Sequence, residues 1–105
     1  MSLRYLGNSN LVSAAAQTAV GITAGSVLAA NSGRKGFMIQ NTGTTTIKLS
    51  FGATNPTQTV YHVALRSAGV ADDGTGATYT DDLWTDAVRA ISSVAGGTIV
   101  ITEFI

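Results

Sequence analysis

Two short runs of alternating apolar and polar residues restrict this chain to β-structure more strongly than any other feature of its sequence. The first run covers residues 36–41 and the second covers residues 46–51. Their alternate apolar positions are Phe37, Ile39, Ile47, Leu49 and Phe51. Because successive side chains of a strand point to opposite faces, each run predicts a strand with one buried face. The segment NTGTTT between them predicts a turn that pairs the runs as a hairpin, so that their apolar residues form one wall of a core.

Turn signals divide the rest of the chain into further short segments. The sequence contains 12 glycines, and Thr, Val and Ile are common, which is typical of strands. Further strands are predicted within residues 21–29, 59–65, 83–92 and 97–105. A long acidic loop, residues 67–82, separates two of them. This pattern predicts an all-β protein, an antiparallel β-sandwich or jelly-roll-like domain that covers residues 20–105.

The first 19 residues differ from this pattern. The stretch LVSAAAQTAV is rich in Ala, the strongest helix former, so a short helix is one interpretation. A run this brief makes a marginal helix without packing. We therefore expect residues 1–19 to form an extended N-terminal arm that contacts a neighbouring subunit.

Charged residues make up only 11% of the 105 residues, well below the usual share of about 25%. A free-standing domain uses surface charge to stay apart from its neighbours, so this deficit predicts a surface covered by other copies or by a partner. The formal net charge is zero and the basic residues form no stripe, which argues against nucleic acid as a partner. No stretch reaches the ~18–20 apolar residues of a membrane-spanning helix, so we expect no membrane partner.

The sequence offers little equipment for catalysis. It contains no cysteine, and His62 is its one histidine. A histidine base needs a nucleophile and an orienting acid, and no G-x-S-x-G motif is present to supply the nucleophile. We therefore expect no catalytic residue, no metal site and no cofactor, and we expect that the protein is not an enzyme.

Acidic and aromatic residues gather towards the end of the long loop. The string DDGTG loosely matches calcium loops, but it lacks their carboxylate spacing, and Asp and Gly are also ordinary turn formers. Tyr79 and Trp84 could stack on a sugar beside the aspartates. The alternative is that Trp84 fills the core or an interface, where Trp commonly lies. We favour the structural interpretation for both features.

Arg34 and Lys35 are the only adjacent basic residues in the chain, and they follow an Asn-Ser-Gly turn. The planar guanidinium of Arg34 can reach a carbonyl or a carboxylate with several donors. One interpretation is an anchor for a partner, and the other is a lock on the turn. The sequence does not decide between them.

Several strings resemble a family of small tailed-bacteriophage virion proteins. They are LAANSGRKG at residues 28–36, IQNTG at 39–43, FG at 51–52 and VRAISSVAGGTIVITE at 88–103. The resemblance implies a capsid decoration (cement) protein, a homotrimer that binds the major capsid protein or another virion protein, on the capsid surface of the virion. The alternative is a carbohydrate- or receptor-binding module of a phage tail or fibre.

The predicted interface combines the basic pair, the acidic loop with its aromatic residues, and the apolar C-terminal strand. Its candidate residues are Arg34, Lys35, Asp72, Asp73, Tyr79, Asp81, Asp82, Trp84, Ile99, Ile101 and Phe104.

Overall fold

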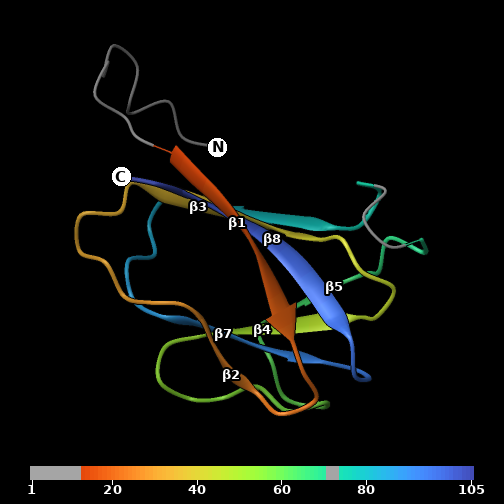
Figure 1. Cartoon of the computed structure of the whole chain (residues 1–105). Helices are drawn as coiled ribbons and strands as arrows, with labels where there is room; N and C mark the ends of the chain where they lie inside the picture. Colours follow the sequence, from red (N-terminus) through yellow and green to blue (C-terminus); the bar gives the residue numbers. More distant parts are fainter. Residues whose placement is uncertain (1–12, 71–73) are drawn as a thin grey trace.

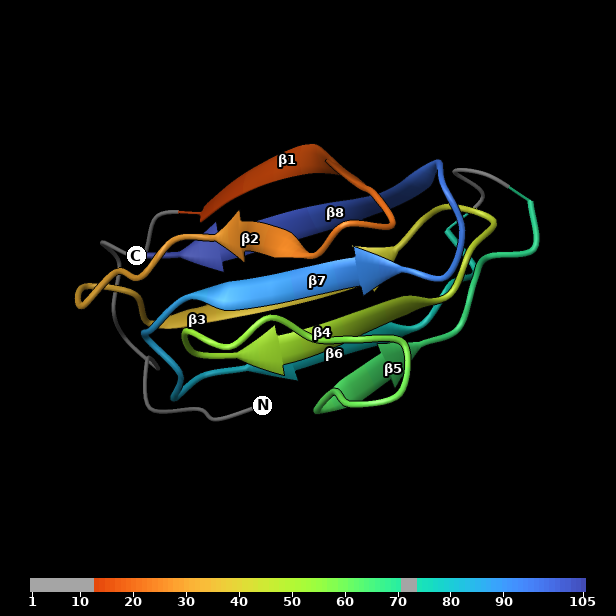
Figure 2. The ribbon, with the colours of Figure 1, turned by 90° about the horizontal axis from the view of Figure 1, so that it is seen from below.

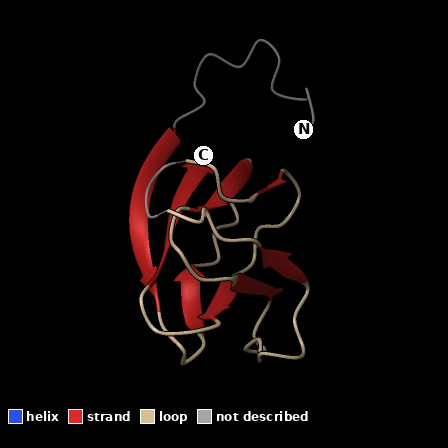
Figure 3. Ribbon diagram, turned by 90° about the vertical axis from the view of Figure 1, so that its right-hand side faces the viewer, coloured by secondary structure: helices blue, strands red, loops and turns tan. Residues whose placement is uncertain are grey.

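The computed structural model describes residues 13–70 and 74–105, which Figure 1 traces along the chain. The regular structure of these residues consists of strands, as the side view in Figure 3 shows. The strands are β1 (Ser13–Val20), β2 (Gly25–Leu28), β3 (Gly36–Asn41), β4 (Ile47–Phe51), β5 (Val63–Leu65), β6 (Thr78–Asp81), β7 (Val88–Ser92) and β8 (Gly97–Phe104). Within the described ranges, no helix is long and apolar enough to span a membrane.

The strands form two antiparallel sheets that pack face to face (Figure 2). Sheet A has the order β1-β8-β3-β6, and sheet B has the order β2-β7-β4-β5. The chain changes sheet at every connection except the one between β4 and β5. This arrangement confirms the predicted all-β sandwich, with the strand order of a jelly roll.

The predicted hairpin over residues 36–51 is wrong, because its two strands lie in different sheets. β3 pairs with β8 and β6, whereas β4 pairs with β7 and β5. The segment between them crosses from sheet A to sheet B and is held by the fully buried side chain of Asn41. Its Nδ2 donates to the carbonyls of Thr45 and Leu65, and its Oδ1 accepts from the Gly43 N–H. These bonds give partners to backbone N–H and C=O groups of a turn that lies inside the protein.

The core lies between the two sheets. The predicted alternation correctly indicates which side chains point inward, and Phe37, Ile39, Ile47 and Leu49 have no exposed surface. They form two facing walls, not one, because the first pair belongs to sheet A and the second to sheet B. The core consists of Val20, Phe37, Ile39, Ile47, Leu49, Leu65, Val88, Ala90, Ile99 and Ile101.

Two strands occur where the sequence predicted none. Residues 13–19, assigned to an arm, belong to β1, which pairs with β8 along its whole length. The other interpretation, a helix, does not hold for these residues either. Residues 1–12 of the predicted arm lie outside the described residues. β6 lies within the predicted loop 67–82 and pairs with β3. Both strands are edges, so each is held by a single neighbour.

The outer faces of the two sheets differ. Residues 52–62 connect β4 to β5 and lie over the outer face of sheet B, with hydrogen bonds running in both directions between them (Figure 2). Arg89 donates from Nε to the Gly52 carbonyl and from Nη1 to Asn55 Oδ1. Gln58 donates from Nε2 to the Ser92 carbonyl. On the outer face of sheet A, Gln40 Nε2 donates to the Gly74 carbonyl of the β5–β6 loop at 3.0 Å.

Candidate assembly surfaces

Arg34 is a buried structural lock, although it was also a candidate anchor for a partner. Only 4% of its surface is exposed. Its Nε donates to Glu103 Oε2 at 2.8 Å, its Nη1 donates to the carbonyls of Trp84 and Asp86 at 3.1 Å each, and its Nη2 donates to the Ala29 carbonyl. One side chain therefore joins the β2–β3 loop, the β6–β7 loop and β8. Lys35, the other member of the basic pair, is half-buried.

Tyr79 and Trp84 belong to an aromatic cluster that closes the sandwich between β6 and β4. The Phe51 ring lies 5.3 Å from the Tyr79 ring and 5.9 Å from the Trp84 ring, measured between centroids. Trp84 Nε1 donates to the Ala87 carbonyl at 3.0 Å. Both rings are half-buried against the core. Tyr79 and Trp84 both pack against Phe51, which agrees with the interpretation of Trp84 as a core residue.

Asp81 completes this cluster. Its Oδ2 accepts a hydrogen bond from the Tyr79 hydroxyl at 2.8 Å, and its Oδ1 accepts from the N–H groups of Leu83 and Trp84. Burial alone would raise the pKa of Asp81, but these hydrogen bonds and the nearby charge of Arg34 outweigh it and lower the pKa. Burial, the hydrogen bond to Asp81 and the charge of Asp81 raise the pKa of Tyr79 to about 12. The pair orders the start of the β6–β7 loop.

The remaining candidate residues fall in different places. Ile99 and Ile101 point into the core. Phe104 is half-buried on the outer face of sheet A, and Asp82 is half-buried at the end of β6. Asp72 and Asp73 lie outside the described residues. No group of three or more metal-ligating side chains occurs within residues 13–70 and 74–105.

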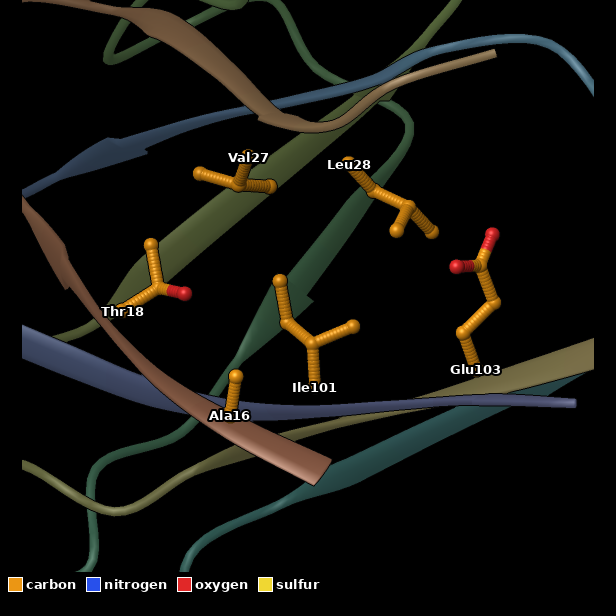
Figure 4. Close-up of a pocket in the computed structure, with 6 residues that line it drawn as sticks. All are labelled: Ala16, Thr18, Val27, Leu28, Ile101 and Glu103. Carbon is orange, nitrogen blue, oxygen red and sulfur yellow. The ribbon is translucent and has the colours of Figure 1, made fainter. Parts of the chain in front are cut away.

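A groove opens on the side of the sandwich opposite the aromatic cluster, between edge strands β1 and β2. Figure 4 shows Ala16, Thr18 and Ile101 on one wall and Val27 and Leu28 on the other, with the Glu103 carboxylate at one end. The groove has a volume of about 170 Å³. It exists because the inward residues of β1 are too small to fill the space between the sheets. The sequence did not predict this groove, because it depends on β1 and β2 lying together.

Among the described edge strands, β1 is the longest. It is eight residues long, has no charged residue or proline, and reads SAAAQTAV. Natural proteins usually protect edge strands with charges, prolines, bulges or short length. The edges of sheet B have such protection, because β5 has three residues and β2 has four with a bulge near Ser26.

The unpaired groups of β1 can be assigned from the pairing pattern. The Thr42 N–H donates to the Thr98 carbonyl across sheet A, and hydrogen-bonded pairs alternate along an antiparallel ladder. The even-numbered residues of β8 therefore bond towards β3, and its odd-numbered residues bond towards β1. It follows from the register that Ala15, Gln17 and Ala19 direct their backbone N–H and C=O groups to the open edge.

One solved structure shares this architecture. It is described by the words "Bacillus endospore appendages form a novel family of disulfide-linked pili", and it matches with 20% identity and a TM-score of 0.50 over 90% of this chain and 84% of that one. At this identity the likeness shows the fold alone. No family model and no curated protein matches the sequence.

This finding contradicts the resemblance to tailed-bacteriophage virion proteins. The structure that shares the fold comes from a spore appendage and not from a virion. The interpretations as a capsid decoration protein, as a phage receptor- or carbohydrate-binding module and as a virion-surface homotrimer are therefore wrong. A major capsid protein as partner has no support. The similar structure is that of Bacillus endospore appendages, which form disulfide-linked pili.

Proposed function

We propose that the protein is a structural subunit that polymerises through the open edge of β1, forming a filament. The observation that carries the proposal is the long, uncharged and unprotected edge of β1. Such an edge is a template for pairing with another strand. The pilus that shares the fold supports the same class of function. The buried contacts of Arg34 and the packed aromatic cluster make the described part of the subunit a firmly connected body, which suits a structural role.

The topology of sheet A suits open polymerisation. Three antiparallel pairings separate β1 from β6, so the two edges run in opposite directions. A second copy displaced across the sheet would therefore offer its β6 to β1 in the antiparallel sense used throughout the molecule. Each junction leaves another β1 and another β6 free. A head-to-tail contact of this kind generates an open filament when the rotation between successive copies does not close into a ring.

The bonds between subunits differ in one respect from those of the similar protein. That protein forms disulfide-linked pili, whereas this sequence contains no cysteine. Its subunits must therefore associate without disulfides, through backbone hydrogen bonds and side-chain contacts. We expect a reducing agent to leave its filaments intact.

The experiment removes the free donors of β1 and leaves its pairing with β8 unchanged. Ala15→Pro together with Ala19→Pro deletes two N–H groups that face the open edge. The control is Ala15→Val with Ala19→Val, which keeps both N–H groups. Purified proteins are examined by negative-stain electron microscopy and by sedimentation velocity, and circular dichroism monitors the fold.

We expect the wild type and the valine variant to form filaments and the proline variant to remain in small species with a native spectrum. Filaments of undiminished length from the folded proline variant would refute the role of β1. A wild type that forms no filaments over a range of concentration and salt would refute the proposed function.

A further inference from the structure

The outer face of sheet A is a second feature that a free-standing molecule would not need. The outward positions of β8 are Thr98, Val100, Thr102 and Phe104. All four side chains are half-buried. Their partners on the inward side, such as Ile99, belong to the core. β8 is therefore apolar or uncharged on both of its faces.

The flanking strands continue this surface. The register places Met38 and Gln40 of β3 beside Thr102 and Val100, and places Ala15 and Gln17 on the other side of β8. β6 adds two threonines at the edge. The described side chains in the middle of this face are uncharged, and one charged residue, Asp82, lies at its end beside Gly36. Charged residues are depleted at the centres of interfaces, so the composition is typical of a surface that is covered.

The outer face of sheet B differs, because it is covered by a segment of the same chain. Its outward residues include Lys48 and Arg89, and both donate to the segment 52–62 that lies over them. Ser50 also donates to that segment, at the Thr54 carbonyl. Sheet B thus carries two basic residues bound to its own cover. Among the described residues, the outer face of sheet A carries one such bond, from Gln40 to the Gly74 carbonyl, and one charge at its end, Asp82.

We propose that the outer face of sheet A packs against the same face of a second copy of this chain. Threonine hydroxyls and glutamine amides both donate and accept hydrogen bonds, so this face complements itself without bringing like charges together. Two sheets can stack face to face about 10 Å apart. The four strands span about 400 Å² per copy before side-chain relief is counted, so the pair would bury on the order of 1,000 Å², the lower end of specific interfaces.

This contact is separate from the edge of β1 and would join polymers side by side or make dimers of unpolymerised subunits. A two-fold axis would relate the copies, so that each residue near the axis meets its own counterpart. Val100 occupies the middle of the face, on a central strand. A charge at this position would be buried beside an identical charge, and we expect it to abolish the contact.

The test uses Val100→Lys, with Val94→Lys as its control, because Val94 is exposed in the β7–β8 turn outside this face. Both are made in the Ala15→Pro/Ala19→Pro background, in which the edge is blocked. Sedimentation velocity at about 100 µM, with circular dichroism for the fold, gives the oligomeric state. We expect dimers for the background and for Val94→Lys, and monomers for Val100→Lys.

A second measurement uses the absence of cysteine from the sequence. Val100→Cys, oxidised in the otherwise wild-type chain, should form a disulfide-linked dimer, whereas Val94→Cys should not. The inference is overturned if the edge-blocked protein is monomeric and Val100→Cys forms no more dimer than Val94→Cys. It is also overturned if folded Val100→Lys remains dimeric. Neither result bears on polymerisation through β1, which is tested by the filaments themselves.

Discussion

The Nε atom of Arg34 donates a hydrogen bond to Glu103 Oε2 at 2.8 Å and joins residues 69 positions apart in the chain. The arginine side chain is fully buried, and Glu103 is about one-fifth exposed. The other donors of the guanidinium bind backbone carbonyls, so its charge is surrounded by acceptors. This arrangement joins two loops and strand β8 at one end of the sandwich, and it explains why a charged side chain is found inside so small a core.

Replacement of Arg34 should destabilise the fold strongly. In Arg34→Ala, the Glu103 carboxylate and three carbonyls lose their donor, and breaking a buried pair in this way costs about 3 kcal/mol or more. Arg34→Lys should recover only part of the loss, because an ammonium cannot match the planar fork. The measurement is urea denaturation of the purified variants. A loss below about 0.5 kcal/mol for Arg34→Ala would contradict the lock.

Some of these relationships could be predicted from the sequence, and others could not. The inward positions of Phe37 and Leu49 follow from alternation, which is a local property of any strand. Their assignment to different sheets does not, because it depends on hydrogen bonds that Asn41 makes to residues far along the chain. The role of Arg34 could not be decided for the same reason, since its acceptors lie between 5 and 69 positions away.

The sequence did not predict the strand β1, because its inward and outward residues do not differ in polarity. Ala16 points inward and Ala15 points outward, so no alternation of apolar and polar residues marks the strand. Its conformation is imposed by pairing with β8, from Ser13 opposite Phe104 to Val20 opposite Gly97, far along the chain. The apolar C-terminal strand was recognised, but its two faces look alike, and only the structure shows that Ile99 faces the core and Val100 faces outward.

The phenol of Tyr79 should make stability depend on alkaline pH. Its pKa rises to about 12 on folding, so the folded protein holds this proton more tightly than the unfolded chain. The stabilisation is therefore complete below about pH 10 and is lost as the pH rises from about 10 to about 12. Tyr79→Phe should weaken the decline of stability over this range. At pH 8 the variant should be less stable by about 1 kcal/mol, because Asp81 loses a hydrogen bond.

The measurement for Tyr79 is chemical denaturation at several pH values between 8 and 12. Tyr61→Phe is the control, because Tyr61 is exposed and lies outside the aromatic cluster of Tyr79 and Trp84. An alkaline decline that is equally steep in Tyr79→Phe and in the wild type would show that the Tyr79–Asp81 pair does not contribute to it.

Filling the groove between β1 and β2 should stabilise the subunit. Ala16 lines this groove, and Ala16→Leu would place additional apolar atoms in a volume of about 170 Å³ beside Val27 and Ile101. Cavity-filling substitutions commonly increase the free energy of unfolding by about 1 kcal/mol. Ala15→Leu is the matched control, since its side chain lies on the opposite face of the same strand. Thermal denaturation should show a higher Tm for Ala16→Leu than for Ala15→Leu, and the reverse order would contradict the open groove.

Gly76 marks a point where the backbone allows no side chain. A Cβ atom at this position would lie 1.7 Å from the Asn41 carbonyl oxygen and 3.3 Å from the Ala68 nitrogen. Neither neighbour can withdraw easily, because the Asn41 N–H donates to the Ala77 carbonyl and the Ala68 N–H donates to the Gly43 carbonyl. Three segments of the chain therefore meet at this glycine.

Gly76→Ala should lower the free energy of unfolding by about 3 kcal/mol or more, because relief of the overlap must separate these segments. Gly25→Ala is the control, because no atom lies within 4 Å of the Cβ position at Gly25 in β2. There the substitution should be neutral or stabilise by about 0.5 kcal/mol, since alanine loses less backbone entropy on folding than glycine. Urea denaturation of both variants makes the comparison. Equal stabilities would mean that the crossing of Asn41, Ala68 and Gly76 is looser than this geometry requires.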